Sequence, residues 1–491
     1  MKTLSKSRFV SGIQCEKKLW FEYHRKDLKL PPDAQKQAVF DLGNHIGLFA
    51  QEAFPNGKDA TPENYADLTP SLENTRKWIA AGETTIYEAT FSAKNTFCML
   101  DILHTKDGEL WAIEVKSSTS VKEYHLTDAS LQYYVMKNAG FPPDRFFIMH
   151  IDNQYVKQGE ITPDIFCLAE ITKMVLENQD WVEQNLNRLL TMLETDTEPE
   201  MQIGGHCSTP FGCEYTHHCW QHIPEDSVFQ LYRGGRKGWE LYEQGVLSIA
   251  DIADDFPLTH FQNLQRNGLR NQENYFNCDA IKNIISQWKF PLYFFDFETV
   301  FPAIPVLDGT RPYQQIPFQY SLHILDETGH LTHKEFLANP EDFSNGKNPL
   351  QQMVAQLKRD FDDHGSIVAY NDSFEKLRLR DLARFFPEEA LFLNNLIERT
   401  VDLLPVFRDG HCYFPEMKNS ASIKSILPAI APNFSYDNLE IQDGGAASAL
   451  FLHAIEEKGF TTPGLRENLL RYCERDTLAM VMIYRFLLTV I

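Results

Sequence analysis

The chain has 491 residues, 43% of them hydrophobic, and carries a formal net charge of −22 at neutral pH. Its length predicts two or three domains with ordinary apolar cores, and its charge argues against binding nucleic acid over the whole surface. Residues 1–29 are the exception, because they hold eight Lys or Arg residues and three acidic ones, so we expect one local basic surface. The sequence shows no apolar leader and no run of about 18 apolar residues. With nine cysteines and no secretory features, the protein is expected in the reducing cytoplasm, with no membrane partner.

The N-terminal part predicts two helices followed, further on, by a β-hairpin. Residues 7–29 have a helical pattern that includes Cys15, and a second helix over 34–53 carries His45. The segment 98–117 consists of two apolar runs joined by a Lys-Asp-Gly turn, which is typical of a hairpin.

Three ionisable residues lie inside the strands of this hairpin. Asp101 is on the first strand, whereas Glu114 and Lys116 are two positions apart on the second and project from one face. A carboxylate within a strand is costly to bury unless something pairs with it. Two carboxylates and one ammonium on one patch of sheet could hold a divalent cation and a water. The alternative is a cross-strand salt bridge on a solvated face.

The remaining elements divide the chain into a strand-containing part, a helical connector and an α/β part. We expect further helices over 128–140, which carries Gln132, and 163–195, and a strand over 144–151. Residues 224–288 predict short helices without strands. Alternating strands and helices then predict an α/β domain, with strands at 291–299, 318–325, 332–337 and 366–370 and helices at 349–363, 373–386, 423–430, 464–475 and 476–489.

Acidic residues recur at three places in the C-terminal part. Asp296 and Glu298 lie two positions apart on an aromatic-rich strand, where two buried acids demand compensation. Glu375 follows a strand end at the start of a helix, and Tyr472 and Asp476 are one helical turn apart. Asp402 is one more candidate acid.

The spacing D-x12-E-x-K of Asp101, Glu114 and Lys116, followed by a helical D-x3-Q-Y-Y, resembles the PD-(D/E)xK nuclease superfamily in its RecB-like branch. The resemblance implies that Asp101 and Glu114 bind Mg²⁺ or Mn²⁺ together with the backbone carbonyl of Val115. It implies that Lys116 polarises the attacking water or the scissile phosphate.

Two further residues have two readings each. By the same resemblance, His45 is a metal ligand; the alternative is a core histidine. Gln132 orients DNA or Lys116; the alternative is an ordinary amide on a helix surface.

Four cysteines flank this predicted domain: Cys15 precedes it, and Cys207, Cys213 and Cys219 follow it. The layout resembles the iron–sulfur exonucleases, among them the CRISPR-associated RecB-like exonuclease and the AddB nuclease domain. It implies a [4Fe–4S] cluster, although four thiolates equally suit structural zinc. The spacing C-x5-C-x5-C departs from the usual C-x2-C-x5-C, so His206, His217 or His218 could replace one thiolate.

The C-terminal order, a strand D-x-E, then N-x2-F-acid and a helical Y-x3-D, resembles the DEDD exonucleases of the RNase H-like fold, in their DEDDy type. Residues 420–430 resemble a helix of the same fold. The resemblance implies that Asp296, Glu298, Glu375 and Asp476 hold two metal ions, while Tyr472 orients the attacking water. Glu375 stands where most members have Asp.

Together these features predict a RecB-like nuclease over 1–223, a helical connector over 224–288 and an RNase H-like domain over 289–491. The whole chain resembles a bacterial family in which two such domains are fused. The expected function is a metal-dependent exonuclease acting on nucleic acid, in the first place single-stranded DNA, in DNA repair or in defence against foreign DNA. The alternative is one active nuclease domain joined to a degenerate domain that only binds nucleic acid or serves assembly.

Overall fold

The computed structural model of the chain describes residues 2–32 and 34–491. Its fold is mixed α/β, and it divides into two compact units: Met1–His222 with Ala303–Tyr313, and Ile223–Pro302 with Gln314–Ile491. The segment predicted as a separate connector therefore belongs to the second unit. Within the described residues, no helix combines the length and the apolar character needed to cross a bilayer.

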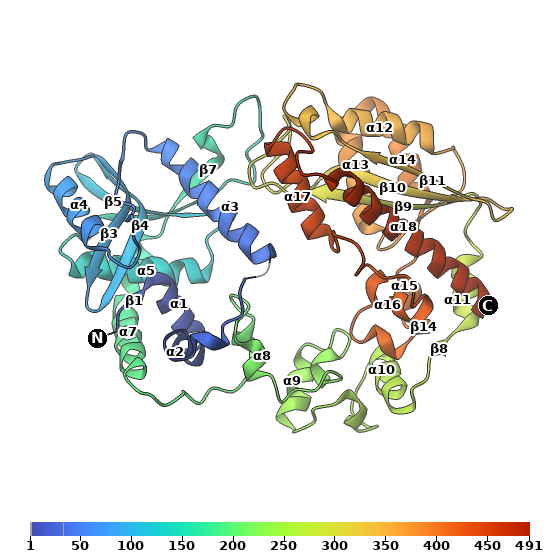
Figure 1. Cartoon of the computed structure of the whole chain (residues 1–491), viewed down its shortest axis with the longest axis horizontal. Coiled ribbons are helices and arrows are strands. Elements are labelled where there is room, and N and C mark those ends of the chain that lie inside the picture. The colour runs from blue at the N-terminus through green and yellow to red at the C-terminus, as the bar shows by residue number, and fades with distance from the viewer. Residues whose placement is uncertain (1, 33) are drawn as a thin grey trace. The chain divides into compact units, whose positions relative to one another are not determined.

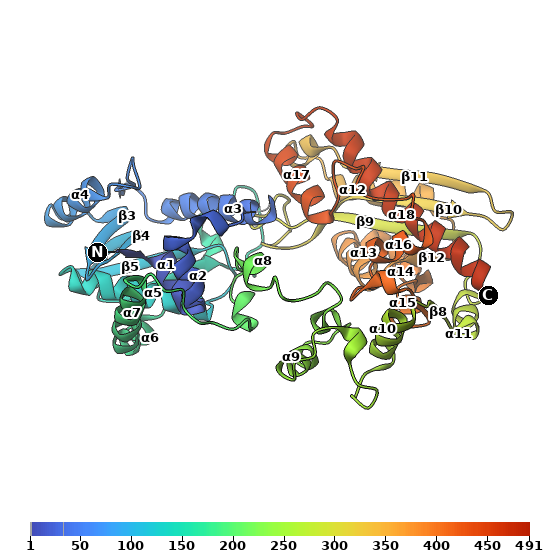
Figure 2. The same cartoon turned by 60° about the horizontal axis from the view of Figure 1, so that its bottom comes forward.

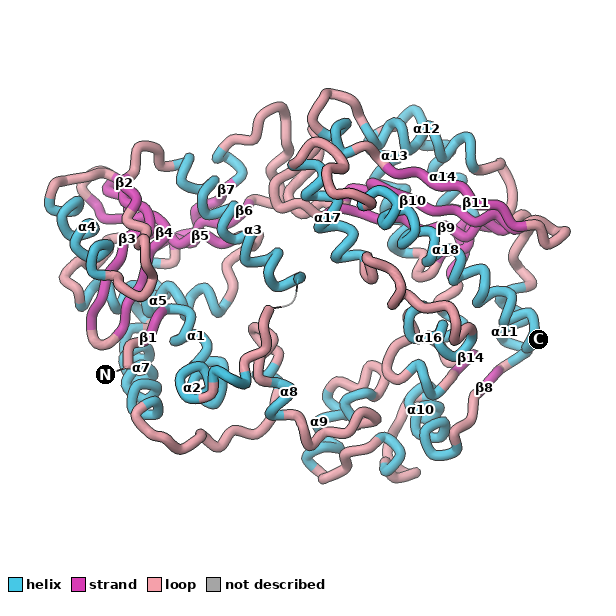
Figure 3. Tube along the Cα trace, in the orientation of Figure 1, coloured by secondary structure: helices cyan, strands magenta, loops and turns pink. Residues whose placement is uncertain are grey.

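The first unit is built on a seven-stranded sheet in the order β2-β3-β4-β5-β6-β7, with β1 beside β4 (Figure 3). The predicted hairpin is confirmed, because β4 and β5 pair antiparallel across Asp107 and Gly108, whose φ angles of 53° and 86° suit a tight turn. The strands are β1 (Leu4–Ser5), β2 (Lys58–Asp59), β3 (Thr85–Ala93), β4 (Thr96–Lys106), β5 (Glu109–Lys116), β6 (Arg145–Ile151) and β7 (Phe166–Glu170).

Helices cover both faces of this sheet (Figure 1). Helix α3 (Ala34–Ala50) packs on one face through Ile46 and Ala50. Helices α1 (Lys6–Gln14), α5 (Glu123–Asn138) and α7 (Gln179–Leu193) share the core on the other face. The unit also contains α2 (Glu16–His24), α4 (Thr69–Ala80), α6 (Thr172–Glu177) and α8 (Thr216–Cys219).

Two predictions of single long helices in this unit are wrong. The first breaks at Cys15, whose backbone is extended and whose sulfur accepts a hydrogen bond from the Lys18 amide at 3.4 Å, which caps α2. The second, over 163–195, contains β7 near its start, because the edge of β6 offers a strand partner that overrides helical periodicity. It breaks again at Asn178, whose side chain bonds Ser130.

The second unit contains a five-stranded sheet in the order β11-β10-β9-β12-β13. Strand β10 runs antiparallel to both β9 and β11, whereas β12 runs parallel to β9 and β13. The strands are β9 (Leu292–Val300), β10 (Ile316–Leu325), β11 (Leu331–Leu337), β12 (Ser366–Ala369) and β13 (Thr400–Asp402). A two-residue strand within the predicted connector, β8 (Tyr275–Phe276), pairs with β14 (Cys412–Tyr413), so the expectation of a strand-free connector is wrong.

Helices α17 (Gly444–Glu456) and α18 (Leu465–Val490) pack against β9 and β10 (Figure 2). Two separate helices were predicted where α18 is continuous. On the opposite face the Tyr320 hydroxyl of β10 bonds Asp360 of α12 (Pro349–Asp360), among aromatic rings that include Phe295. The remaining helices are α9 (Arg236–Glu243), α10 (His260–Asn271), α11 (Cys278–Ile285), α13 (Ser373–Phe385), α14 (Ala390–Arg399), α15 (Pro405–Arg408) and α16 (Ile423–Ile430).

Candidate active sites and a cysteine cluster

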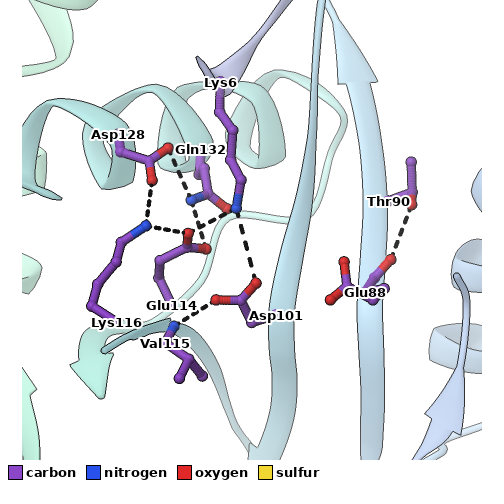
Figure 4. A network of polar contacts seen from close by, with 9 residues as sticks. All are labelled: Lys6, Glu88, Thr90, Asp101, Glu114, Val115, Lys116, Asp128 and Gln132. Carbon is purple, nitrogen blue, oxygen red and sulfur yellow. Dashed lines mark hydrogen bonds and ion pairs between the residues drawn. The ribbon is translucent and has the colours of Figure 1, made fainter. Parts of the chain in front are cut away.

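The first candidate site lies where the β4–β5 ladder ends. Pairing stops at Ile102 and Ile113, and beyond this point an Asp101 carboxylate oxygen accepts the Val115 amide hydrogen at 2.6 Å (Figure 4). The Asp101 side chain thus takes the place of the backbone carbonyl that would otherwise accept the Val115 amide hydrogen. It lies next to Glu114. The structure therefore brings the two predicted carboxylates together at one end of the hairpin.

Lys6 enters this site from the N-terminus and was missed in the sequence. Strand β1 pairs with β4 at Thr96 and Phe97, whereas β5 pairs with β4 only from Ile102 onward. Lys6 directly follows β1, and its Nζ lies 2.7 Å from Glu114 Oε1 and 4.0 Å from Asp101 Oδ1. An ammonium group thus lies between the two carboxylates. The basic composition of residues 1–29 was the signal that could have pointed to it.

Lys116 and Gln132 fix the other side of Glu114, as Figure 4 shows. Lys116 Nζ donates to Glu114 Oε1 at 2.7 Å and to Asp128 Oδ2 at 2.8 Å. Gln132 Nε2 donates to Glu114 Oε2 at 2.8 Å, whereas its own carbonyl oxygen is buried without a hydrogen-bond partner in the described residues. Gln132 is fully buried, which excludes the surface-amide reading.

The charges of this site are unequally compensated. Burial alone would raise the pKa of Glu114, but the Lys116 and Lys6 ammonium groups hold it well below its usual range. Burial and the Glu114 charge raise the pKa of Asp101 to about 6. Burial and the Asp101 charge raise the pKa of Glu88 to about 8. Glu88 and Asp101 are therefore the members of the site that lack sufficient positive charge.

Glu88 sits at a backbone irregularity opposite Asp101. Ladder pairs Tyr87–Ile102 and Ala89–Leu100 flank the two acids, and Glu88 has a φ of 51°, which is uncommon for a non-glycine residue. Backbone in such sparsely populated regions clusters at functional sites.

His45 is not brought into this group. It is exposed on α3, and its neighbour Ile46 is the residue that enters the core. Among the described residues, no hydrogen bond or ion pair is found between His45 and Asp101 or Glu114. Val115 contacts the site through its amide hydrogen.

The second candidate site combines all five residues predicted in the C-terminal part. Asp296 and Glu298 extend from β9, Glu375 from the first turn of α13, and Tyr472 and Asp476 from α18. A Glu298 oxygen lies 3.4 Å from where a side chain on Gly444 would begin, so the start of α17 borders the acidic group. Cys473 Sγ lies 3.8 Å from Asp296 Oδ2.

Burial raises the pKa of all four carboxyl groups of this site, and neighbouring acids of the site raise those of Asp296 and Glu298 further. Burial together with Asp476, Glu298 and Glu375 raises the pKa of Asp296 well above its usual range. Burial and Asp476 raise the pKa of Glu298 to about 8. Burial raises the pKa of Asp476 to about 6 and that of Glu375 to about 8. One oxygen of Glu375 is buried without a partner in the described residues. Four acids thus converge with little compensating charge.

Two residues near these acids were not predicted individually. Lys424, at the start of α16, places its Nζ 5.0 Å from the Tyr436 ring centre and 5.4 Å from that of Tyr472, and its charge favours the ionised form of Glu298 and Asp476. The Tyr436 hydroxyl donates to Asp476 Oδ1 at 2.5 Å. The resemblance of residues 420–430 to a helix of the RNase H-like fold was the sequence signal for Lys424. No sequence signal pointed to Tyr436.

Asp402 has a structural role as well as a nearby charge. Its Oδ1 accepts the amide hydrogens of Asn371 and Leu404, each at 2.9 Å, which ties the ends of β12 and β13 together. Its charge adds to the raised pKa of Glu375.

The four predicted cysteines line one cavity in the first unit, together with His206. Gln14 at the end of α1 donates to the backbone oxygens of His206 and Phe211 at 2.7 and 2.6 Å, which links the N-terminal helix to the cysteine loop. Burial raises the pKa of Cys213 to about 11, so the thiolate form needs a nearby cation.

The sulfur atoms are spread more widely than in a closed zinc site. Within the described chain, the cysteines form no group of three ligand atoms that lie within 4.8 Å of one another. In a tetrahedral site with Zn–S bonds of ~2.3 Å, sulfurs lie roughly 3.8 Å apart. His217 and His218 do not line the cavity, so His206 is the histidine placed to act as an alternative ligand.

Comparison with known proteins finds relatives of unassigned function. A family model described as "Domain of unknown function (DUF2779)" matches residues 293–422, a range that includes Asp296, Glu298 and Glu375. The "Uncharacterized protein MG366 homolog" of Mycoplasma pneumoniae is 32% identical over 228 residues, 43% of this chain and 34% of the relative. The "Uncharacterized protein MG366" of Mycoplasma genitalium is 27% identical over 228 residues, with the same coverage of 43% and 34%.

The "Uncharacterized protein UU173" of Ureaplasma parvum is 25% identical over 273 residues, 51% of this chain and 38% of the relative. The chain therefore spans about a third of the length of these curated relatives. Among solved structures, the crystal structure of SSO0001 aligns with a TM-score of 0.21 and 14% identity, covering 45% of this chain and 88% of that one. A likeness at this level does not define a fold.

Proposed function

We propose that this protein is a divalent-metal-dependent nuclease that hydrolyses phosphodiester bonds, with single-stranded DNA as the expected substrate. The observation that carries the proposal is the convergence of Asp296, Glu298, Glu375 and Asp476 in a buried group, in which burial raises every pKa and the neighbouring acids raise those of Asp296 and Glu298 further. Such a group is costly unless cations neutralise it. Perturbed carboxyl groups of this kind cluster at functional sites.

The donor set fits Mg²⁺ or Mn²⁺. These hard ions prefer carboxylate oxygens, and Glu375 offers a buried oxygen without a partner in the described residues. When bound, the ions neutralise the phosphodiester and lower the pKa of the attacking water. Glu375 extends from the first turn of α13 and is near enough for its charge to raise the pKa of Asp296.

The neighbouring side chains supply positioning. Tyr472 is buried beside Asp476, and burial with that charge raises the pKa of its hydroxyl above the ordinary value, so it stays protonated and can orient a water. Lys424 brings the nearby ammonium group, which suits a contact with a substrate phosphate. The mixed sheet with acids on its central strand, covered by α17 and α18, supports assignment of this unit to the RNase H-like fold.

For the first unit we propose a PD-(D/E)xK nuclease site at Asp101 and Glu114. Lys116 is held between Glu114 and Asp128, and burial is outweighed by these acids, which raise the pKa of Lys116 above the ordinary value. It therefore acts as a fixed positive charge rather than as a base. Gln132 keeps Glu114 in place.

The cysteine cavity supports a cluster-type cofactor in the same unit. Cys15, Cys207, Cys213 and Cys219 would hold a [4Fe–4S] cluster, because their sulfurs surround one cavity at a spacing wider than a single zinc ion requires. The cluster would tie the junction of α1 and α2 to the end of the unit.

A second candidate function is a nuclease active only in the C-terminal unit, with the first unit binding nucleic acid. The observation that favours it is Lys6, whose ammonium lies 2.7 Å from Glu114 and supplies the charge that a metal ion would otherwise bring. The C-terminal acids have no equivalent ion pair in the described residues.

The test is digestion of single strands labelled at the 5′ or the 3′ end, with Mg²⁺ or Mn²⁺, using Asp101→Asn and Asp296→Asn. Under the two-site proposal each variant loses one polarity of digestion. Under the one-site alternative only Asp296→Asn loses cleavage. Asp196→Asn and Asp255→Asn, at exposed positions of the two units, are matched controls. Metal-dependent cleavage that persists in the double variant Asp101→Asn/Asp296→Asn would contradict both assignments.

A further inference from the structure

Two histidines and a glutamate converge in the second unit, beside the acidic site but outside it. His323 on β10 pairs with His333 on β11, and their ring centres lie 4.5 Å apart. Glu474 on α18 places Oε1 3.9 Å from His333 Nδ1. One ligand atom of each of the three residues lies within 4.8 Å of the others. His323 is buried, whereas His333 and Glu474 remain partly accessible, so solute can reach the group from one side.

One nitrogen of each imidazole ring is hydrogen-bonded to a hydroxyl group, that of Thr477 for His323 and that of Ser321 for His333. Thr477 donates to the Glu474 backbone oxygen at 3.1 Å, so its oxygen is left to accept. His323 Nδ1 lies 2.8 Å from the Thr477 hydroxyl, and Ser321 Oγ lies 2.7 Å from it. In the arrangement in which Thr477 donates to the Glu474 carbonyl, it accepts hydrogens from both.

The same hydrogen-bond directions determine which nitrogen of His333 carries the proton. Because Ser321 donates to Thr477, its oxygen accepts from His333 Nε2, which lies 2.9 Å away. Each ring thus carries its proton on the nitrogen that bonds a hydroxyl. The other nitrogens, His323 Nε2 and His333 Nδ1, keep free lone pairs, and His333 Nδ1 lies 3.9 Å from Glu474 Oε1.

We propose that His323, His333 and Glu474 form a binding site for a divalent transition-metal ion such as Zn²⁺. Two neutral imidazoles and one carboxylate are a preferred donor set for such ions. Two ligands at ~2.1 Å from a tetrahedral ion lie roughly 3.4 Å apart, so the 3.9 Å between Glu474 and His333 needs little adjustment. The hydroxyls of Ser321 and Thr477 supply the outer hydrogen bonds that orient metal-binding histidines.

This site differs from the acidic site in its chemistry and in what it holds together. Nitrogen donors select Zn²⁺ or a similar ion over Mg²⁺. A bound ion would clamp α18 to β10 and β11 through Glu474, which lies less than one turn from Tyr472 and from Asp476 on the same helix. The site does not rest on the proposed nuclease activity and is testable without it.

The test uses the full chain, stripped with a chelator and titrated with Zn²⁺ by calorimetry and with Co²⁺ by absorption spectroscopy. The wild type is expected to bind one more ion than His333→Ala. The Co²⁺ spectrum of the wild type minus that of His333→Ala should lack the sulfur charge-transfer band that the cysteines would give. Glu474→Gln is expected to weaken this step about tenfold or more. His330→Ala, at an exposed turn before β11, is the matched control and should bind like the wild type.

Footprinting of the wild type keeps the proposal testable if His333→Ala does not fold. Zn²⁺ should protect His333, but not His330, from carbethoxylation by diethyl pyrocarbonate, as read by peptide mass spectrometry. Equal Zn²⁺ stoichiometry and affinity in the wild type and a folded His333→Ala would overturn the proposal. So would equal modification of His333 with and without Zn²⁺.

Discussion

Replacing Glu298 by Gln should stabilise the metal-free protein at alkaline pH while removing the activity of the second site. Burial and the neighbouring Asp476 raise the pKa of Glu298 from 4.5 to about 8. Between these values the native state binds more protons than the unfolded state, so stability falls as pH rises through this window. Above pH ~8 the native state must hold the charged group against the repulsion.

The magnitude follows from the size of the shift. A rise of roughly 3.5 pH units corresponds to about 5 kcal/mol at 1.36 kcal/mol per unit. The repulsion is shared with Asp476, so we expect Glu298→Gln to gain about 2 to 5 kcal/mol at alkaline pH and close to nothing below the ordinary pKa of a glutamate. Mg²⁺ or Mn²⁺ should shift the difference toward the wild type, because an ion at about 100 times its Kd adds ~2.7 kcal/mol to the wild type.

Denaturant unfolding in EDTA at about pH 5 and about pH 9, with and without Mg²⁺, measures these differences. Glu327→Gln, an exposed glutamate of the same unit, is the control and should follow the wild type throughout. If Glu298→Gln is no more stable than Glu327→Gln at alkaline pH in EDTA, the reasoning from the raised pKa fails. If Mg²⁺ stabilises Glu298→Gln as much as the wild type, Glu298 is not a metal ligand.

The other predictions concern the first unit. Lys6→Met removes one ammonium partner of the buried Glu114 and should cost about 1 to 3 kcal/mol of stability in the absence of divalent ions, but it should tighten Mn²⁺ binding; a weaker Mn²⁺ affinity by calorimetry would show that Lys6 does not compete with a metal. Cys213→Ser should lose the iron, the sulfide and the brown absorbance near ~400 nm expected of anaerobically purified wild type. Cys167→Ser, a cysteine outside the cavity, should keep them. Colourless wild type with stoichiometric zinc would contradict the iron–sulfur assignment.

Much of the local structure could be predicted because periodicity and turn residues are local signals. The hairpin around Asp107 and Gly108 and the strand that carries Asp296 and Glu298 are examples. The predictions were wrong where tertiary contacts determine the secondary structure. The stretch 166–170 became a strand because the edge of β6 was available. Cys15 interrupts a helical pattern because its side chain caps the next helix.

The members of the candidate sites that the sequence could not identify are those whose role depends on distant pairing. Lys6 reaches Glu114 across 108 positions. Strands β1 and β5 pair with the same edge of β4, and the unpaired stretch of β4 between them leaves room for the Lys6 side chain. Tyr436 reaches Asp476 across 40 positions from a loop without a recognisable pattern. Spacing within a strand or helix could indicate the acids, but not the residues that complete their surroundings.

The two acidic sites differ in the origin of the positive charge that they require. At Glu114 the chain itself supplies it, through Lys6 and Lys116 at 2.7 Å each, and the pKa of Glu114 falls below its usual range as a result. At Glu298 the described residues supply the more distant Lys424, whose charge does not outweigh burial and Asp476, and the pKa rises. A site that carries its own cations can stay ionised and folded without a metal, whereas a site of four acids can ionise fully only when ions arrive. Metal binding should therefore be coupled to proton release chiefly in the second unit, and to displacement of a lysine side chain in the first.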